Sequence, residues 1–279
     1  MSAYPAPGRL LDIGGRRLHA YATGKGRPVV VLESGLAATS LSWRIVQDEV
    51  AKFTRVISYD RAGLGWSDPS SARPTISALV ADLHVMLSAA QEPPPYILVG
   101  HSFGGLIVRA FADRYRDEVR GLVLVDPLRP EEFCPLSEER RRLLARGVRL
   151  SRRGATLARM GVVGWCLRSV LAGSRWLPKT VGLATSGRGA AVMNRLAGEV
   201  AKMPRELWPA VASHWSNPKS FQAMGQQMEA LPECCAEMCR ASGADIPATV
   251  LTAKDAGSGH WIHLDKPELV VDAVRAFAR

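Results

Sequence analysis

The stretch from Tyr96 to Gly105 places a serine at a sharp turn between a predicted strand and a predicted helix. Residues 96–99 form a short, apolar and largely β-branched run, which predicts a buried strand. The next five residues match G-x-S-x-G with Ser102 at the centre, and apolar residues at helical spacing follow. In this context the pattern predicts a nucleophilic serine exposed above a sheet. The amide of Phe103, at the start of the helix, is predicted to bind an oxyanion.

Further apolar runs alternate with helical patterns on both sides of this stretch. They predict strands at 28–32, 55–59, 121–125 and 248–252, preceded by a hairpin over 9–21, and helices over 74–91 and from Pro267 onward. Such alternation predicts a mostly parallel sheet, in which functional groups gather at the carboxyl ends of the strands. Ser102 and Asp126 both follow such ends.

The alternation stops in the middle of the chain. From Leu128 to about Asp245 β-branched residues are sparse, and Leu, Ala, Arg and Met dominate. This composition predicts a helical insertion. We therefore divide the chain into a core of residues 1–127 and 246–279 and a helical cap or lid of residues 128–245.

Three motifs resemble those of the α/β-hydrolase family. They are the Ser102 stretch, the segment Asp60-Arg-Ala-Gly-Leu-Gly-Trp-Ser67, which resembles D-R-x-G-x-G-x-S, and a histidine loop at 259–268. The resemblance covers Arg9 to Asp126 and Pro247 to Arg279. It implies an α/β fold with a mostly parallel central sheet flanked by helices, and with a helical cap insertion.

The resemblance also implies a catalytic triad. His260 stands where the family has its histidine, so we expect it to take the proton of Ser102, with His263 as the alternative base. The family most often places the acid after the seventh strand, at Asp255, but the helix and eighth strand that normally follow are missing here. We therefore favour Asp126 as the acid and keep Asp255 as the alternative.

The remaining motif residues are expected to shape the site. By resemblance, the loop after residue 32 supplies a second oxyanion amide, from Leu36. Glu33 stands where the family usually has histidine, and we interpret it as a structural hydrogen-bonding residue. Asp60 and Arg61 are expected to brace their loop, and Asp265 to cap the final helix.

These features predict a cofactor-independent serine hydrolase, most simply an esterase or lipase-like enzyme that forms an acyl-enzyme on Ser102. A serine argues against dehalogenase and epoxide hydrolase chemistry, for which relatives use an aspartate. The same site would suit an amidase, a lactonase, a carbon–carbon bond hydrolase or an acyltransferase. A non-catalytic binding protein on a hydrolase scaffold is the alternative outside enzymology. Cys234, Cys235 and Cys239 have no histidine at zinc-site spacing, so no metal site is predicted.

The net charge of +10 resides in one segment. Residues 140–179 hold eleven Arg and Lys and no Asp or Glu. No nucleic-acid-binding motif accompanies them, so nucleic acid is not an expected partner. Their mixture of Leu and Arg suits weak contact with an anionic membrane surface, or a cap helix that buries its apolar face on the core. The chain starts without a secretory signal pattern and its cysteine use implies no disulfides, which predicts a cytoplasmic protein.

Overall fold

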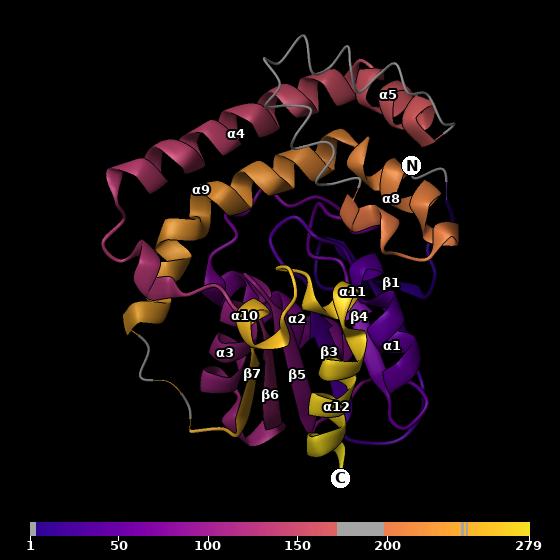
Figure 1. Cartoon of the computed structure of the whole chain (residues 1–279), viewed down its shortest axis with the longest axis vertical. Coiled ribbons are helices and arrows are strands. Elements are labelled where there is room, and N and C mark those ends of the chain that lie inside the picture. The colour runs from indigo at the N-terminus through magenta and orange to yellow at the C-terminus, as the bar shows by residue number, and fades with distance from the viewer. Residues whose placement is uncertain (1–3, 172–197, 241–242, 244) are drawn as a thin grey trace.

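The structure is a computed structural model that describes residues 4–171, 198–240, 243 and 245–279 (Figure 1). Within these residues seven strands form one sheet in the order β1-β2-β4-β3-β5-β6-β7. The strands are β1 (Arg9–Asp12), β2 (Arg17–Thr23), β3 (Val29–Glu33), β4 (Val56–Tyr59), β5 (Tyr96–His101), β6 (Val119–Val125) and β7 (Ala248–Leu251).

The sheet is parallel except at one edge. β1 pairs with β2, and β2 with β4, in antiparallel fashion, while the strands from β4 across to β7 pair in parallel. Every residue of β3, β4 and β5 is buried, as expected for central strands of a sheet that is covered on both faces. The predicted hairpin is present, with Gly14 and Gly15 at positive φ in its turn. The predicted α/β class with a mostly parallel sheet is confirmed.

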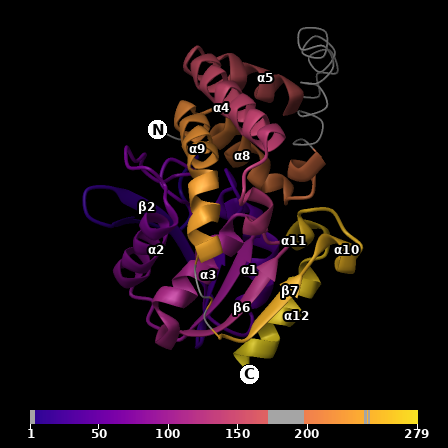
Figure 2. The ribbon, with the colours of Figure 1, turned by 90° about the vertical axis from the view of Figure 1, so that its left-hand side faces the viewer.

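Helices cover both faces of the sheet (Figure 2). The longer helices are α1 (Arg44–Val50), α2 (Ile76–Ala90), α3 (Gly104–Arg114), α4 (Glu138–Arg159), α5 (Val162–Leu171), α8 (Trp208–Trp215), α9 (Pro218–Arg240) and α12 (Pro267–Ala278). The short helices are α10 (Ala253–Ala256) and α11 (Ile262–Asp265). The 3-10 turns are η1 (Ser40–Trp43), η2 (Arg116–Glu118), η3 (Pro130–Phe133) and η4 (Arg205–Leu207). α2 and α3 share one buried apolar cluster, which includes Leu83 and Phe111. α1 and α12 share a second cluster on the opposite face, with Val46 and Val274.

The first residue of α2 and the capping residue of α12 differ from the sequence expectation. α2 begins at Ile76, because the Thr75 hydroxyl accepts the Ala78 amide at 3.2 Å and caps the helix, so Pro74 lies outside it. α12 begins at Pro267, as predicted, but its cap position is Lys266. The prediction that Asp265 caps this helix is wrong, because its carboxylate binds the preceding loop instead.

The helices α4, α5, α8 and α9 all come from the segment predicted as a cap. They lie together at one end of the sheet (Figures 1 and 2). α9 reaches the loop that follows β3, where the Gln227 side chain accepts the Ala37 amide at 3.0 Å. This end is therefore the carboxyl end of the parallel strands, where the candidate site residues were expected.

The sheet ends at β7. β7 lies beside β6, and in the described part of the chain no strand follows it. Only the single turn of α10 and a short loop separate it from His260. The sheet is thus one strand short of the arrangement that the resemblance implied, and the histidine loop follows the seventh strand directly. Across the described ranges, none of the helices combines the length and apolarity needed to cross a bilayer.

Candidate active site

Ser102 occupies a strained turn between β5 and α3. Its φ is +52°, in the left-handed region that side chains rarely adopt. The neighbouring chain segments approach this turn so closely that two positions in it require glycine. A Cβ on Gly100 would lie 2.6 Å from a methyl carbon of Val108, and one on Gly104 would lie 2.6 Å from the carbonyl oxygen of Glu33. The Ser102 amide donates to the Val125 carbonyl at 3.0 Å, which holds the turn against the end of β6.

His260 and Asp126 form a close pair beside this turn. The Nδ1 atom of His260 lies 2.6 Å from Oδ2 of Asp126, and the Ala253 amide donates to the other carboxylate oxygen at 3.0 Å. Burial alone would raise the pKa of Asp126, but these two hydrogen bonds outweigh it, and the pKa lies below its ordinary value. Asp126 is therefore ionised near neutral pH and holds the ring through Nδ1, which leaves Nε2 as the nitrogen that can accept a proton. Among the described residues, no hydrogen bond joins Ser102 to His260.

The two alternative residues lie elsewhere. Asp255 is exposed in α10, where its carboxylate accepts the Thr252 hydroxyl at 2.6 Å. His263 is fully buried, with its ring centroid 4.2 Å from that of Trp43. Burial holds the pKa of His263 well below its usual value, so its ring stays neutral. The structure thus pairs His260 with Asp126 and brings neither alternative into that pair.

The His101 side chain holds the loop that carries His260. Its Nε2 donates to the backbone carbonyl of His260 at 3.0 Å, and the side chain is 1% exposed. Burial, with a further contribution from the neighbouring His260 side chain, lowers the pKa of His101 to about 3. The loop is also held by Asp265, whose carboxylate accepts the Ser258 hydroxyl at 2.9 Å and the Gly259 amide at 3.2 Å. Neither supporting role was predicted from the sequence.

The amides of Leu36 and Phe103 were predicted to form an oxyanion site. Neither amide donates a hydrogen bond to another residue in the part of the chain that the structure describes, so both remain available. The loop that carries Leu36 runs close to the serine, since a Cβ on Gly35 would lie 3.5 Å from Cβ of Ser102. Ala37 has a φ of +58°, and the side chain of Gln227 holds its amide. A helix of the predicted cap therefore fixes the geometry of this loop, a contact that no sequence pattern indicated.

Glu33 and Arg61 form a buried ion pair beneath the loop. The Arg61 guanidinium also donates to the carbonyl oxygens of Ser34, at 2.6 Å, and Gly35. Tyr59 donates its hydroxyl to Glu33. These contacts agree with the interpretation of Glu33 as a structural residue and of Arg61 as a brace of its loop.

Asp60 braces the same region from the other side. It is fully buried and accepts hydrogen bonds from His19, at 2.9 Å, and from the amides of Ser40 and Trp66. Burial would raise the pKa of Asp60, but these donors hold it well below its ordinary value. A Cβ on Gly65 would lie 2.0 Å from the carboxylate, which explains why the motif has glycine there.

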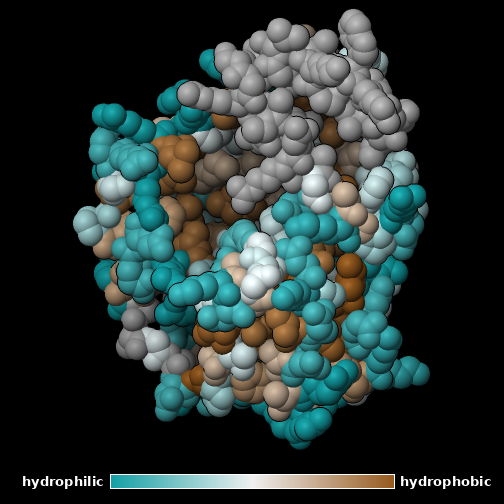
Figure 3. All heavy atoms as spheres, viewed as in Figure 1, coloured by the Kyte–Doolittle hydropathy of each residue, from teal (hydrophilic) through white to brown (hydrophobic). Residues whose placement is uncertain are grey.

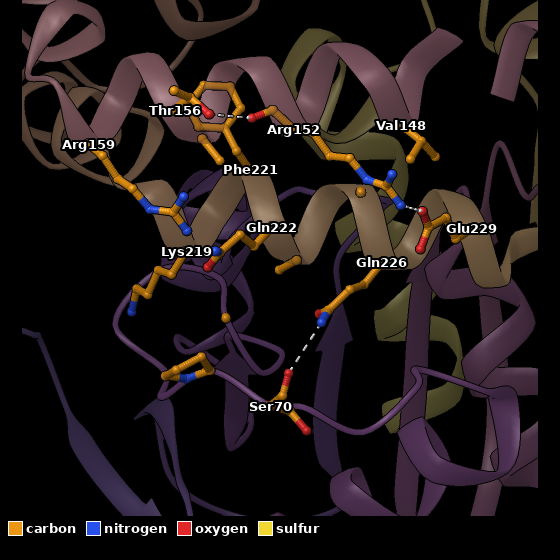
Figure 4. Close-up of a pocket in the computed structure, with 15 residues that line it drawn as sticks. Ser70, Val148, Arg152, Thr156, Arg159, Lys219, Phe221, Gln222, Gln226 and Glu229 are labelled. Carbon is orange, nitrogen blue, oxygen red and sulfur yellow. Dashed lines mark hydrogen bonds and ion pairs between the residues drawn. The ribbon is translucent and has the colours of Figure 1, made fainter. Parts of the chain in front are cut away.

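A separate pocket of about 530 Å³ lies between α4, α9 and the loop at 63–70 (Figure 4). Its lining mixes polar and apolar residues, and in Figure 4 the side chains of Arg159 and Lys219 lie on one side of it and those of Arg152 and Glu229 on the other. Gln226 points into this pocket and donates to the Ser70 carbonyl at 3.5 Å. Its neighbour Gln227 instead binds the loop near Ser102, so consecutive residues of α9 contact this pocket and the candidate active site. Among the described residues, no group of three or more His, Cys, Asp and Glu side chains could hold a metal ion.

Residues 28–153 match a family model described as alpha/beta hydrolase fold. The structure of a mutant of a putative epoxide hydrolase from Pseudomonas aeruginosa aligns over 96% of this chain and 94% of its own, with a TM-score of 0.68 and 15% identity. The chain has the α/β-hydrolase fold. At this identity the structural likeness establishes the fold alone.

The relatives in sequence match only part of the chain. The uncharacterised protein YqjL of Bacillus subtilis is 34% identical over 104 residues, which is 37% of this chain and 41% of that protein. The 2-hydroxy-6-oxo-2,4-heptadienoate hydrolase of Pseudomonas putida is 37% identical over 121 residues, which is 42% and 44% of the two chains. Each match thus spans less than half of the relative's length.

Proposed function

We propose that this chain is a serine hydrolase that cleaves carboxylic esters through an acyl-enzyme on Ser102. The observation that carries the proposal is that two features lie at the carboxyl ends of the neighbouring parallel strands β5 and β6. One is Ser102 at a φ of +52° on a strand–helix turn, and the other is the His260–Asp126 pair at 2.6 Å. A serine hydroxyl becomes a useful nucleophile only when a base takes its proton.

In this mechanism Nε2 of His260 takes the proton of Ser102 as the oxygen attacks the ester carbonyl. Asp126 keeps the ring in the required tautomer and stabilises the imidazolium that forms. The amides of Phe103 and Leu36 donate to the oxyanion of the tetrahedral intermediate. His260 then protonates the leaving alcohol, and a water molecule activated by the same histidine releases the acid from Ser102.

A second candidate substrate class follows from one relative. The Pseudomonas putida protein is named for hydrolysis of 2-hydroxy-6-oxo-2,4-heptadienoate. The same nucleophile, base and oxyanion donors of this chain would serve hydrolysis of such a keto acid. The limited coverage of the match makes an ordinary ester the better first proposal.

Turnover of a panel of activated esters with increasing acyl length tests the proposal. We expect turnover by the parent chain, and losses of about a thousandfold or more in Ser102→Ala and in His260→Ala, because triad members act as a unit. The matched control is His263→Ala, whose ring lies outside the pair. Loss of activity in His263→Ala with retention in His260→Ala would refute the choice of base. Turnover of the heptadienoate and of no ester would favour the second candidate.

A further inference from the structure

α4 exposes three of its four leucines to solvent. Leu143, Leu150 and Leu157 have exposed fractions of 67%, 55% and 44%. They recur every seven residues, close to two helical turns, so they form one continuous stripe along the helix. We call these three residues the leucine stripe. Exposed apolar side chains continue after the helix with Met160 at 70% and Trp165 at 60%.

α4 packs on α9 through small side chains instead. A Cβ on Gly147 would lie 2.7 Å from the sulfur of Met228, and one on Gly154 would lie 2.5 Å from the ring of Phe221. The buried residues of α4 are Val148, Ser151, Ala155 and Ala158. A cap helix that simply buries its apolar face would place its leucines here. Of the α4 leucines only Leu144 packs against the core, so the attachment of the helix leaves the leucine stripe unexplained.

Arginines flank the stripe. Arg146 lies three residues after Leu143 and four before Leu150, and Arg153 has the same relation to Leu150 and Leu157, so each is a surface neighbour of two leucines. Neither arginine forms an ion pair within the described ranges, and Arg149 between them is also unpaired there. The only acidic residues of α4 are Glu138 and Glu139, in its first turn. Figure 3 shows hydrophilic and hydrophobic side chains side by side on the part of the surface where α4 lies.

We propose that the leucine stripe and its arginines dock the molecule on an anionic lipid bilayer, with α4 lying in the plane of the surface. Apolar side chains inserted between lipids and cations at headgroup level are the two components of such binding. Among the described elements, α4 and α5 lie farthest from the sheet (Figures 1 and 2). This inference does not depend on the proposed function.

The charge of the arginines and the apolarity of the leucines argue against two other partners. Pairing with a second copy through the same stripe would bring the two sets of arginines together, which like charges disfavour. A nucleic acid would pair with the arginines but would leave the leucines in water, since phosphate contacts supply its non-specific binding. An anionic bilayer would contact both the leucines, through its acyl chains, and the arginines, through its headgroups.

Sedimentation with vesicles tests this proposal. We expect the protein to pellet with phosphatidylglycerol vesicles at about 0.05 M salt, to bind phosphatidylcholine vesicles far less, and to be released as salt rises to about 0.5 M. Replacing the three leucines with serine should lower the partition coefficient about tenfold or more. Replacing Arg146, Arg149 and Arg153 with glutamate should lower it about a hundredfold.

Matched controls change the same chemistry elsewhere. Exposed apolar residues outside α4 are replaced with serine in one variant, namely Leu10, Val85 and Val250. Exposed basic residues outside α4 are replaced with glutamate in another, namely Arg9, Lys25 and Arg120. Both controls should bind vesicles as the parent does, and circular dichroism checks that each variant is folded.

Several results would overturn the proposal. Equal binding to neutral and anionic vesicles, or binding to neither, contradicts it. Loss of binding in the basic control equal to that in the α4 variant would mean that net charge alone is responsible. Sensitivity to the arginines but not to the leucines, with displacement by duplex DNA, would assign the surface to nucleic acid. A dimer in solution that the leucine changes dissociate would assign it to a second copy.

Discussion

Replacing His214 with phenylalanine should make the protein less sensitive to acid. His214 lies in α8, is 2% exposed, and packs edge-on against Trp66 with ring centroids 4.3 Å apart. Both ring nitrogens are buried without a hydrogen-bond partner in the structure. Burial lowers the pKa of His214 to about 4, although the carboxylate of Asp60 acts in the opposite direction; Lys219 and His19 add to the lowering.

The sign and size of the effect follow from this pKa. An unfolded histidine binds its proton near pH 6.5, whereas His214 in the folded protein stays neutral down to about pH 4. The unfolded state therefore binds more protons across this window, and stability is lost as the pH falls. The loss is about 1.4 kcal/mol per pH unit, which gives about 2 kcal/mol between pH 7 and pH 5. Phenylalanine binds no proton, so His214→Phe should escape this loss.

Chemical denaturation of the parent and of His214→Phe at pH 7 and pH 5 measures the difference. The stability of the variant relative to the parent should rise by about 2 kcal/mol on acidification. Val30→Ala, a buried change that removes no titrating group, should give the same stability difference from the parent at both values. An unchanged difference for His214→Phe would mean that its ring is already solvated or charged in the folded protein, and would refute the reasoning.

Two further predictions concern the candidate site. Asp126→Asn should lower kcat/KM for esters about a thousandfold, because an amide at this position favours the wrong tautomer of His260. Asp255→Asn should lower kcat/KM less than about twofold. A larger loss in Asp255→Asn than in Asp126→Asn would identify Asp255 as the acid. Gln227→Ala should lower kcat about tenfold with a smaller effect on KM, because the Ala37 amide loses its acceptor and the loop that carries the predicted oxyanion donor Leu36 is no longer held. The neighbouring change Gln226→Ala should leave kcat unaltered, because this side chain binds Ser70 instead. Equal effects of the two glutamine changes would point to a general loosening of α9.

The nucleophile turn could be predicted because its determinants are local. A buried strand, G-x-S-x-G and an amphipathic helix are adjacent in the sequence, and the close approaches at Gly100 and Gly104 explain why no other residue fits there. The choice between Asp126 and Asp255 was also open to reasoning, since the short segment before His260 has no room for a further strand. The geometry agrees with that choice, and the catalytic roles remain predictions.

Other parts of the site depend on contacts between distant segments. Gln227 holds a loop 190 residues away, and no periodicity or motif marks it. Asp265 looks like a helix cap in the sequence, yet Lys266 holds the cap position and the Asp265 carboxylate binds Ser258 and Gly259. The packing of α4 also could not be predicted from the sequence. Its mixture of Leu and Arg suited either a membrane surface or a buried cap face, and only the position of α9 shows that mostly small residues form the contact.

Labelling with a fluorophosphonate, followed by peptide mapping, tests the central claim most directly. The account predicts one equivalent of label on Ser102, none in Ser102→Ala, and labelling slowed about a hundredfold or more in His260→Ala, because the base no longer activates the hydroxyl. A folded parent protein that takes up no label, or that takes it up at the same rate in Ser102→Ala, would contradict the account and leave the chain as a binding protein on a hydrolase scaffold.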